Sequence, residues 1–220
     1  MAQRKVSLET EKIYHIFSKS IAGFTIFRNS SEYQRMKDLL KYYNLANLPW
    51  RFSRFLEIKD KQKAYKIYST KKEKLVDIIS YCIMPTHVHL VLKNINCESI
   101  STFMRKILDS YAKYFNVKTK RKGPLWQSRF ENVLVETDEQ LLHLTRYVHL
   151  NPATAYLVDK PEDWQFSSYN EFLSGVEDDK DKICNYLDFL DIKSREYQDF
   201  VNSQINYQKE LADIKKLWIE

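Results

Sequence analysis

A largely apolar segment runs from Leu75 to Leu92, and Pro85-Thr86 interrupts it. Proline cannot donate a backbone hydrogen bond to a sheet, so it occurs at strand ends, sheet edges or bulges. The segment therefore predicts two antiparallel strands joined at Pro85, or one long strand bent there. No apolar run in the chain approaches the ~20 residues that a membrane helix needs, so we expect no membrane association.

The hydrophobic periodicity of the remaining chain predicts two further strands and three helices. The strands are residues 11–25 and 131–136, and the helices are residues 31–43, 99–117 and 138–150. Asn29 or Ser30 is the expected cap of the first helix, and Thr137 or Asp138 that of the third. Side chains of these types accept hydrogen bonds from the free N–H groups at a helix start.

The order strand, helix, strand, strand, helix, strand, helix is typical of a ferredoxin-like (RRM-like) α+β fold, an antiparallel sheet with helices on one face. Residues 46–74 are dense in Lys, Arg and Tyr, and we expect an irregular or hairpin insertion there. Gly175 and the acidic stretch after it mark a boundary. Residues 1–175 should form the main domain and residues 176–220 an acidic helical C-terminal extension.

Basic residues are concentrated in the expected main domain. The net charge is +6, but residues 176–220 hold 11 Asp or Glu and 7 Lys or Arg, which leaves +10 on residues 1–175. A basic body suits a polyanion such as nucleic acid. The three cysteines, Cys82, Cys97 and Cys184, form no C-x-x-C pair, and the chain start lacks the apolar region of a secretory signal, so we expect free thiols in the cytoplasm.

His87 and His89 form the first candidate site. Side chains alternate along a strand, so both imidazoles point to one face while Val88 points to the other. Neutral imidazole is a good ligand for a divalent cation, so the pair could bind a metal. The alternative is that both histidines are simply polar residues on a sheet face. The spacing favours a metal site that still lacks a third ligand.

The third predicted helix carries a polar stripe. His143, Tyr147 and Asn151 recur every four residues, so their side chains share one helix face. We expect this helix to end at Asn151-Pro152, because proline disfavours helical geometry at the residue before it. If the helix crosses the two histidines, the Asn151 amide oxygen could complete a metal shell, with the Tyr147 phenol one turn away as a nucleophile.

Four segments in the same order resemble a known family. MPTHVHLVL (84–92) resembles the HUH motif of single-tyrosine transposases, and RYVHLNP (146–152) resembles the segment that carries their catalytic tyrosine. GPLWQSRFEN (123–132) and WQFSSY (164–169) resemble segments of the REP-associated tyrosine transposase branch. The resemblance covers roughly residues 11–172.

The resemblance implies a metal-dependent enzyme that cuts and rejoins single-stranded DNA, beside a hairpin. It implies that His87 and His89 bind Mg²⁺ or Mn²⁺, with Asn151 at the position of the third ligand. It also implies that Tyr147 attacks the phosphate to form a covalent 5′-phosphotyrosyl intermediate. The family includes both homodimers and monomers, so a homodimer is one expectation for this chain.

A basic loop is expected to hold the DNA strand. Lys120, Arg121, Lys122 and Arg129 surround Trp126 and could contact phosphates. The alternative is a solvated basic turn, with the tryptophan packed into the core.

Other functions compete with a transposase. A histidine-triad hydrolase needs a third alternating histidine, but residue 91 is Val91, and a TIM-barrel amidohydrolase needs repeated strand-helix units. HUH replication initiators and relaxase-type nickases order their motifs differently along the chain. A catalytically silent descendant that only binds hairpin DNA also stays open.

Overall fold

The computed structural model describes residues 7–46, 48–69, 73–174 and 182–217. A four-stranded antiparallel sheet forms its centre, in the order β2-β3-β1-β4. The strands are β1 (Ile13–Lys19), β2 (Val76–Met84), β3 (His87–Asn94) and β4 (Glu131–Val135). With a helix after β1 and another after β3, this order gives the predicted ferredoxin-like topology.

The segment around Pro85 forms a hairpin. β2 and β3 pair in antiparallel register with Met84 opposite His87, so the alternative of a single bent strand is excluded. Pro85 lies between the two strands, where the sheet needs no N–H from it. Its carbonyl accepts hydrogen bonds from the backbone N–H groups of Ile26 and Phe27.

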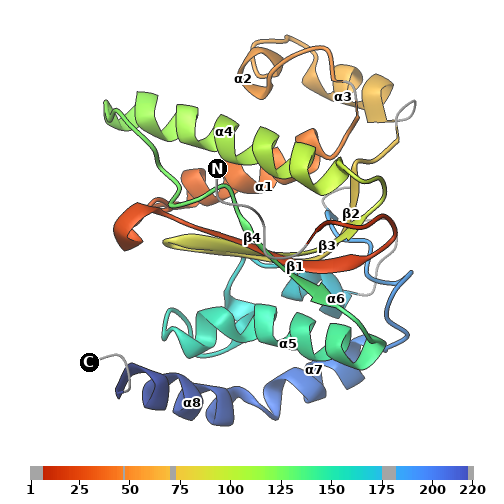
Figure 1. Ribbon diagram of the computed structural model, residues 1–220, viewed down its shortest axis with the longest axis vertical. Helices are drawn as coiled ribbons and strands as arrows, with labels where there is room; N and C mark the ends of the chain where they lie inside the picture. The colour runs from red at the N-terminus through yellow and green to blue at the C-terminus, as the bar shows by residue number, and fades with distance from the viewer. Residues whose placement is uncertain (1–6, 47, 70–72, 175–181, 218–220) are drawn as a thin grey trace.

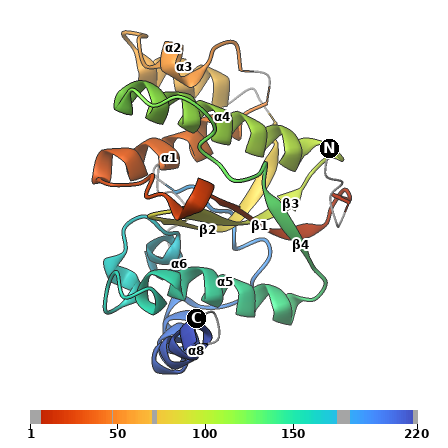
Figure 2. The same cartoon turned by 60° about the vertical axis from the view of Figure 1, so that its left-hand side comes forward.

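Helices cover both faces of the sheet, which corrects the prediction of helices on one face (Figures 1 and 2). α1 (Ser30–Tyr43) and α4 (Ser99–Thr119) lie on one face, and α5 (Asp138–Thr154) packs on the other against β2 and β3. Nearly every residue of these two strands is buried. Strands that are apolar on both faces need cover on both sides.

The insertion at residues 46–74 is helical, so the prediction of an irregular or hairpin segment is wrong. It contains α2 (Phe52–Phe55) and α3 (Lys61–Ser69), while residues 47 and 70–72 lie outside the described residues. Phe52 and Phe55 are one helical turn apart and both are buried. Their rings lie 5.0 and 4.8 Å from that of Tyr42, so aromatic packing anchors α2 to α1.

Two predicted helix caps are present. The Asn29 side chain accepts a hydrogen bond from the Glu32 N–H, and the Thr137 side chain accepts one from the Gln140 N–H. α5 continues past Pro152 to Thr154, so its predicted end at Asn151-Pro152 is too early. Pro152 has no N–H to donate to the Val148 carbonyl, so one helical hydrogen bond is absent there, and its buried ring adds packing instead.

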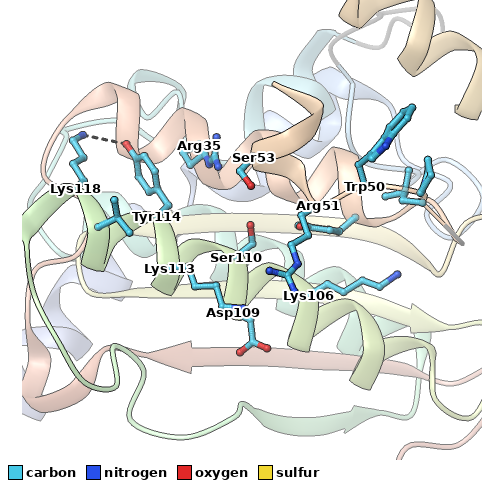
Figure 3. Close-up of a pocket in the computed structure, with 14 residues that line it drawn as sticks. Arg35, Trp50, Arg51, Ser53, Lys106, Asp109, Ser110, Lys113, Tyr114 and Lys118 are labelled. Atoms are coloured by element: carbon cyan, nitrogen blue, oxygen red, sulfur yellow. Dashed lines mark hydrogen bonds between the residues drawn. The ribbon is translucent and has the colours of Figure 1, made fainter. Parts of the chain in front are cut away.

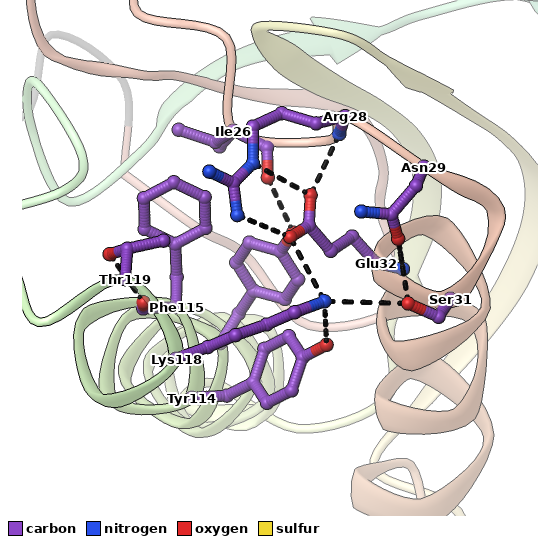
Figure 4. Close-up of polar contacts among 10 residues, drawn as sticks. Ile26, Arg28, Asn29, Ser31, Glu32, Tyr114, Phe115, Lys118 and Thr119 are labelled. Atoms are coloured by element: carbon purple, nitrogen blue, oxygen red, sulfur yellow. Dashed lines mark hydrogen bonds and ion pairs between the residues drawn. The ribbon is translucent and has the colours of Figure 1, made fainter.

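A buried ionic network fixes the start of α1 (Figure 4). The Glu32 carboxylate is fully buried, accepts hydrogen bonds from the backbone and guanidinium of Arg28, and lies 3.1 Å from Lys118 Nζ. Burial raises the pKa of the Glu32 carboxyl, but hydrogen bonds from Arg28 and Lys118 outweigh it and lower the pKa to about 2. The network ties α1 to the end of α4.

The chain after α5 packs against it. α6 (Tyr169–Ser174), α7 (Ser194–Asn202) and α8 (Ile205–Leu217) lie on the α5 side of the sheet, and short 3-10 turns occupy Ile21–Gly23 and Pro161–Asp163. Tyr197 and Val201 of α7 are completely buried. α7 and α8 fall within residues 176–220; the division into a main domain and an extension, with its boundary at Gly175 outside the described residues, stays a prediction. Among the helices described, none is long and apolar enough to cross a membrane.

Candidate functional site

The site lies between the sheet and α5. His87 and His89 project from β3 toward this helix, with ring centroids 4.9 Å apart and the rings nearly perpendicular. His89 is buried and His87 is partly buried. The alternation along β3 therefore brings both imidazoles to one place, as the His-x-His spacing predicts.

A third histidine, which the sequence pattern did not reveal, belongs to this cluster. β1 pairs with β3 so that Phe17 lies opposite His89, and His15 is therefore a diagonal neighbour of His89 on the same face. His15 Nε2 lies 2.9 Å from His89 Nδ1, within hydrogen-bond distance, and the two rings are stacked 5.2 Å apart. The alternation of His15 and Phe17 along the strand was visible in the sequence, but its partner strand was not.

All three imidazoles are neutral at physiological pH. Burial lowers the pKa of His15 to about 4. Burial, with a smaller contribution from Lys19, lowers the pKa of His87 to about 4. Burial also holds the pKa of His89 well below its usual range, assisted by the neighbouring histidines. A neutral imidazole keeps a lone pair that can bind a cation.

The hydrogen bonds of the ligand candidates leave one nitrogen available on each ring. His87 Nδ1 lies 2.8 Å from Thr86 Oγ1, and His89 Nδ1 is occupied by His15. Across the described part of the chain, neither Nε2 atom has a hydrogen-bond partner. Metal-binding histidines are usually held through the second ring nitrogen in this way. The two Nε2 atoms therefore fit a divalent cation.

The protein supplies few other ligands of the usual types. Among the residues that the structure describes, no group of three or more His, Cys, Asp or Glu side chains is placed to hold a metal. A cation bound to the two histidines would need an amide oxygen, water or phosphate oxygen to complete its shell. Mg²⁺ commonly retains waters and binds substrate phosphates.

Tyr147 projects from α5 into the histidine cluster. Its ring centroid lies 5.8 Å from that of His89 and 6.1 Å from that of His15, with edge-on geometry at both. The side chain stays 44% exposed, so a substrate can reach the phenol. Burial raises the pKa of the Tyr147 phenol, partly opposed by a hydrogen bond from Asn151. The phenol is thus accessible but protonated at neutral pH.

Asn151 lies one turn beyond Tyr147 on α5. Its Nδ2 donates a hydrogen bond of 2.8 Å to the Tyr147 carbonyl, a bond that does not use the amide oxygen. His143, one turn before Tyr147, contacts α7 instead, because its ring lies against Phe200, while its Nδ1 lies 2.8 Å from the guanidinium of Arg146 on α5 itself. The predicted stripe is therefore divided between the site and the α7 contact.

His149 has a different environment. It is completely buried, with Nδ1 2.7 Å from the Tyr197 hydroxyl and Nε2 2.7 Å from Ser168 Oγ. Burial lowers its pKa to about 3, so this histidine is neutral. With both nitrogens occupied, it joins α5 to α7 and to Ser168, the residue before α6, and has no nitrogen left for a metal.

The predicted DNA-binding residues lie in the loop between α4 and β4. Lys120, Lys122 and Arg129 are exposed, while the Arg121 guanidinium folds back to within 3.3 Å of Asn116 Oδ1 and the Gly123 carbonyl. The Gln127 N–H donates to the carbonyl of Lys19, the residue opposite His87 in the sheet. The second half of the loop therefore passes beside the histidine end of the site.

Trp126 in this loop has a packing role. Its indole N–H donates to the Leu108 carbonyl, and its ring contacts Phe27 and Tyr111. This position agrees with the alternative of a core tryptophan within a basic turn.

Known proteins are similar to this chain in sequence and in fold. A Haemophilus influenzae protein described as a REP-associated tyrosine transposase is 26% identical over 123 residues, which cover 51% of this chain and 69% of the relative. A solved REP-associated tyrosine transposase bound to a REP hairpin superposes with a TM-score of 0.57 at 14% identity, covering 88% of this chain and 96% of that one.

A family profile gives the strongest assignment. The profile described as "Transposase IS200 like" matches residues 41–151, a range that contains His87, His89 and Tyr147. The resemblance to single-tyrosine transposases, including the REP-associated branch, is thereby confirmed. The chain belongs to the family of IS200-like transposases.

Proposed function

We propose that this protein is a metal-dependent endonuclease and strand transferase that acts on single-stranded DNA through Tyr147. The observation that carries the proposal is the approach of the Tyr147 ring to His89, with the Nε2 atoms of His87 and His89 unpaired among the described residues. A nucleophile beside a pair of neutral cation ligands suits metal-assisted phosphoryl transfer.

His87 and His89 would hold one Mg²⁺ or Mn²⁺ ion, and Asn151 would contribute its amide oxygen as a third ligand. When bound, the cation supplies Lewis-acid stabilisation of the charge that develops on the scissile phosphate. His15 acts as a positioning residue. By accepting the Nδ1–H of His89, it would keep the lone pair of Nε2 directed at the cation.

The proposed reaction exchanges one phosphate ester for another. The Tyr147 hydroxyl loses its proton to water, its oxygen forms a bond to phosphorus, and the bond from phosphorus to the 3′ oxygen breaks. The 3′ oxygen takes up a proton, which leaves a 3′-OH and a 5′-phosphotyrosyl strand. The reverse attack by a 3′-OH would rejoin strands without ATP, because the energy of the ester is retained.

The DNA would approach past the loop between α4 and β4. Lys120, Lys122 and Arg129 are exposed there and carry positive charge toward a phosphate backbone. Arg121 supports the loop through Asn116 and Gly123, so it would act by holding the other cations in place. The REP hairpin bound to the related transposase supports hairpin DNA as the first substrate to test.

The direct test is a covalent-adduct assay. Labelled single-stranded DNA with a hairpin is incubated with the protein and Mn²⁺, denatured, and separated by electrophoresis. We expect a labelled protein band with the wild type and none with Tyr147→Phe, which keeps the ring but lacks the nucleophile. An adduct of equal yield with Tyr147→Phe would refute the assignment of the tyrosine.

The main alternative is a protein that binds hairpin DNA without cutting it. The accessible phenol, and the Nε2 atoms that have no partner in the described part of the chain, favour retained chemistry over this alternative. Hairpin binding without an adduct, in either Mg²⁺ or Mn²⁺, would favour the silent binder.

A further inference from the structure

A second groove lies on the opposite face of the sheet from Tyr147. It has a volume of about 740 Å³ and is formed by α1, α4 and the segment around α2 (Figure 3). α1 and α4 cover one face of the sheet, whereas α5, which carries Tyr147, covers the other (Figure 1). The groove therefore cannot hold the phosphate that Tyr147 attacks.

Positive charge dominates the groove. Five cationic side chains line it, namely Arg35, Arg51, Lys106, Lys113 and Lys118, against the single carboxylate of Asp109. Lys118 is paired with Glu32. Within the described ranges of the chain, the other four form no ion pair. Such a concentration of uncompensated cations attracts a polyanion.

Arg35 is the most informative of these cations. It is partly buried, and its guanidinium lies 4.4 Å from the ring centroid of Phe52 and 4.9 Å from that of Tyr114. Its Nε atom is buried without a hydrogen-bond partner among the described residues. Asp38 on the same helix accepts a hydrogen bond from Gln34 instead. A desolvated guanidinium of this kind is stabilised by an anion that binds in front of it.

The lining suits an extended strand better than a single phosphate. Lys106 and Lys113 lie two turns apart on α4, roughly 10 Å along the helix axis. In Figure 3, Arg51 extends from the start of α2 toward this helix, so cations face the groove from two sides. The ring of Trp50 is 38% exposed at the rim, where an unpaired base could stack on it.

We propose that this groove binds the sugar–phosphate backbone of single-stranded DNA, at a segment other than the one cut at Tyr147. The inference rests on the proposed function in one respect, that the protein acts on DNA. The cations neutralise phosphates and Trp50 stacks on a base, the combination that proteins use to hold single strands without reading their sequence. A strand that reaches both sites must pass around the sheet.

Binding is tested with fluorescein-labelled oligothymidylate, measured by anisotropy over a range of salt concentrations. All proteins carry Tyr147→Phe so that cleavage cannot interfere. The groove variant is Arg51→Gln/Lys113→Gln, in which both side chains are exposed, and the matched control is Lys160→Gln/Arg195→Gln, which removes two exposed cations on the α5 side. Thermal melts check that each variant folds.

We expect the groove variant to bind at least about tenfold more weakly and its salt slope to fall by about 1.4, because each phosphate contact to a single strand contributes about 0.7. The control should keep the parent's affinity and slope. Trp50→Ala should weaken binding by about fivefold or more, the lower range for loss of one stacked base. Affinity and salt slope equal to those of the parent in the groove variant would overturn the proposal. The same holds if the groove variant binds a DNA duplex more weakly but binds oligothymidylate as the parent does.

The adduct assay separates this proposal from the proposed function. With Tyr147 restored, the groove variant should still form adduct at saturating DNA. Weak binding of oligothymidylate with normal adduct yield would support the groove as a binding site that is separate from the catalytic site. Normal binding without any adduct would instead count against the catalytic role of Tyr147.

Discussion

His15 Nε2 lies 2.9 Å from His89 Nδ1 and joins two neighbouring strands at the candidate metal site. If His89 binds a cation through Nε2, its proton must be on Nδ1, and His15 accepts it. Removal of a residue that holds a metal-binding histidine in this way commonly lowers the metal affinity by roughly 10- to 100-fold.

We therefore expect His15→Leu to weaken Mn²⁺ binding by roughly 10- to 100-fold. His15→Gln should stay near wild type, because a glutamine amide oxygen can take the place of Nε2. Titration calorimetry on DNA-free protein measures both. Phe17→Leu, on the same strand and face, is the control for loosened packing and should leave affinity unchanged. Equal Mn²⁺ affinity in His15→Leu and wild type would rule out the positioning role.

Removal of the ligands should separate cleavage from binding. His87→Ala and His89→Ala should each lower adduct formation by a factor of about 100 or more, since metal stabilisation of the transition state is worth several kcal/mol. Hairpin binding, measured by anisotropy, should change by less than about threefold, because the cationic loop is untouched. Chelation of the wild type with EDTA should mimic the variants, and added Mn²⁺ should restore only the wild type. Undiminished cleavage in both alanine variants would disprove the ligand assignment.

Asn151 is tested separately. Asn151→Ala should weaken Mn²⁺ binding if the amide oxygen is a ligand, and Asn151→Asp should restore or strengthen it, because a carboxylate oxygen is also a good ligand for Mn²⁺. Calorimetry again gives the affinity. If both substitutions leave Mn²⁺ affinity unchanged, water or DNA must complete the shell.

The Glu32 network should make stability depend on acid pH. The pKa of the Glu32 carboxyl is lowered from 4.5 to about 2 in the folded protein. Its contribution is complete above pH 4.5 and is lost as the pH falls toward 2, because the unfolded chain takes up the proton first. Glu32→Gln should cost about 1–3 kcal/mol at pH 7 in urea unfolding and flatten this acid decline. The exposed carboxylate variant Glu57→Gln should do neither; an unchanged acid decline in Glu32→Gln would contradict the assignment.

His149 should also lose stability in acid, over a higher pH range. Its pKa is lowered from 6.5 to about 3 by burial, so the unfolded chain binds a proton that the folded chain excludes. Stability from this group is complete above pH 6.5 and declines toward pH 3. His149→Ala should cost about 2–3 kcal/mol and leave Mn²⁺ affinity unaltered. The partly exposed His143→Ala should cost within about 0.5 kcal/mol; a changed Mn²⁺ affinity in His149→Ala would reopen its role.

Local patterns in the sequence determined much of the fold and of the candidate site. The His87-x-His89 spacing placed two imidazoles on one face because a strand alternates, and the Asn29 and Thr137 caps follow from free N–H groups at helix starts. The order of strands and helices predicted the topology, since few arrangements connect such elements without crossing. Hydrophobic periodicity did not predict the helices at residues 46–74, because two buried aromatic side chains, rather than a long apolar face, stabilise α2.

Tertiary structure alone decided which distant residues meet. His15 reaches His89 through the register of β1 and β3, a pairing between residues 74 positions apart that no local pattern encodes. The central strands are apolar on both faces, so α5 covers the face opposite to α1 and α4. This placement brings Tyr147 to the histidines. The same order of layers places Arg35 and Lys113 in a groove on the opposite face of the sheet from Tyr147. Strand register and layer order depend on how the whole core packs, and only the folded chain specifies them.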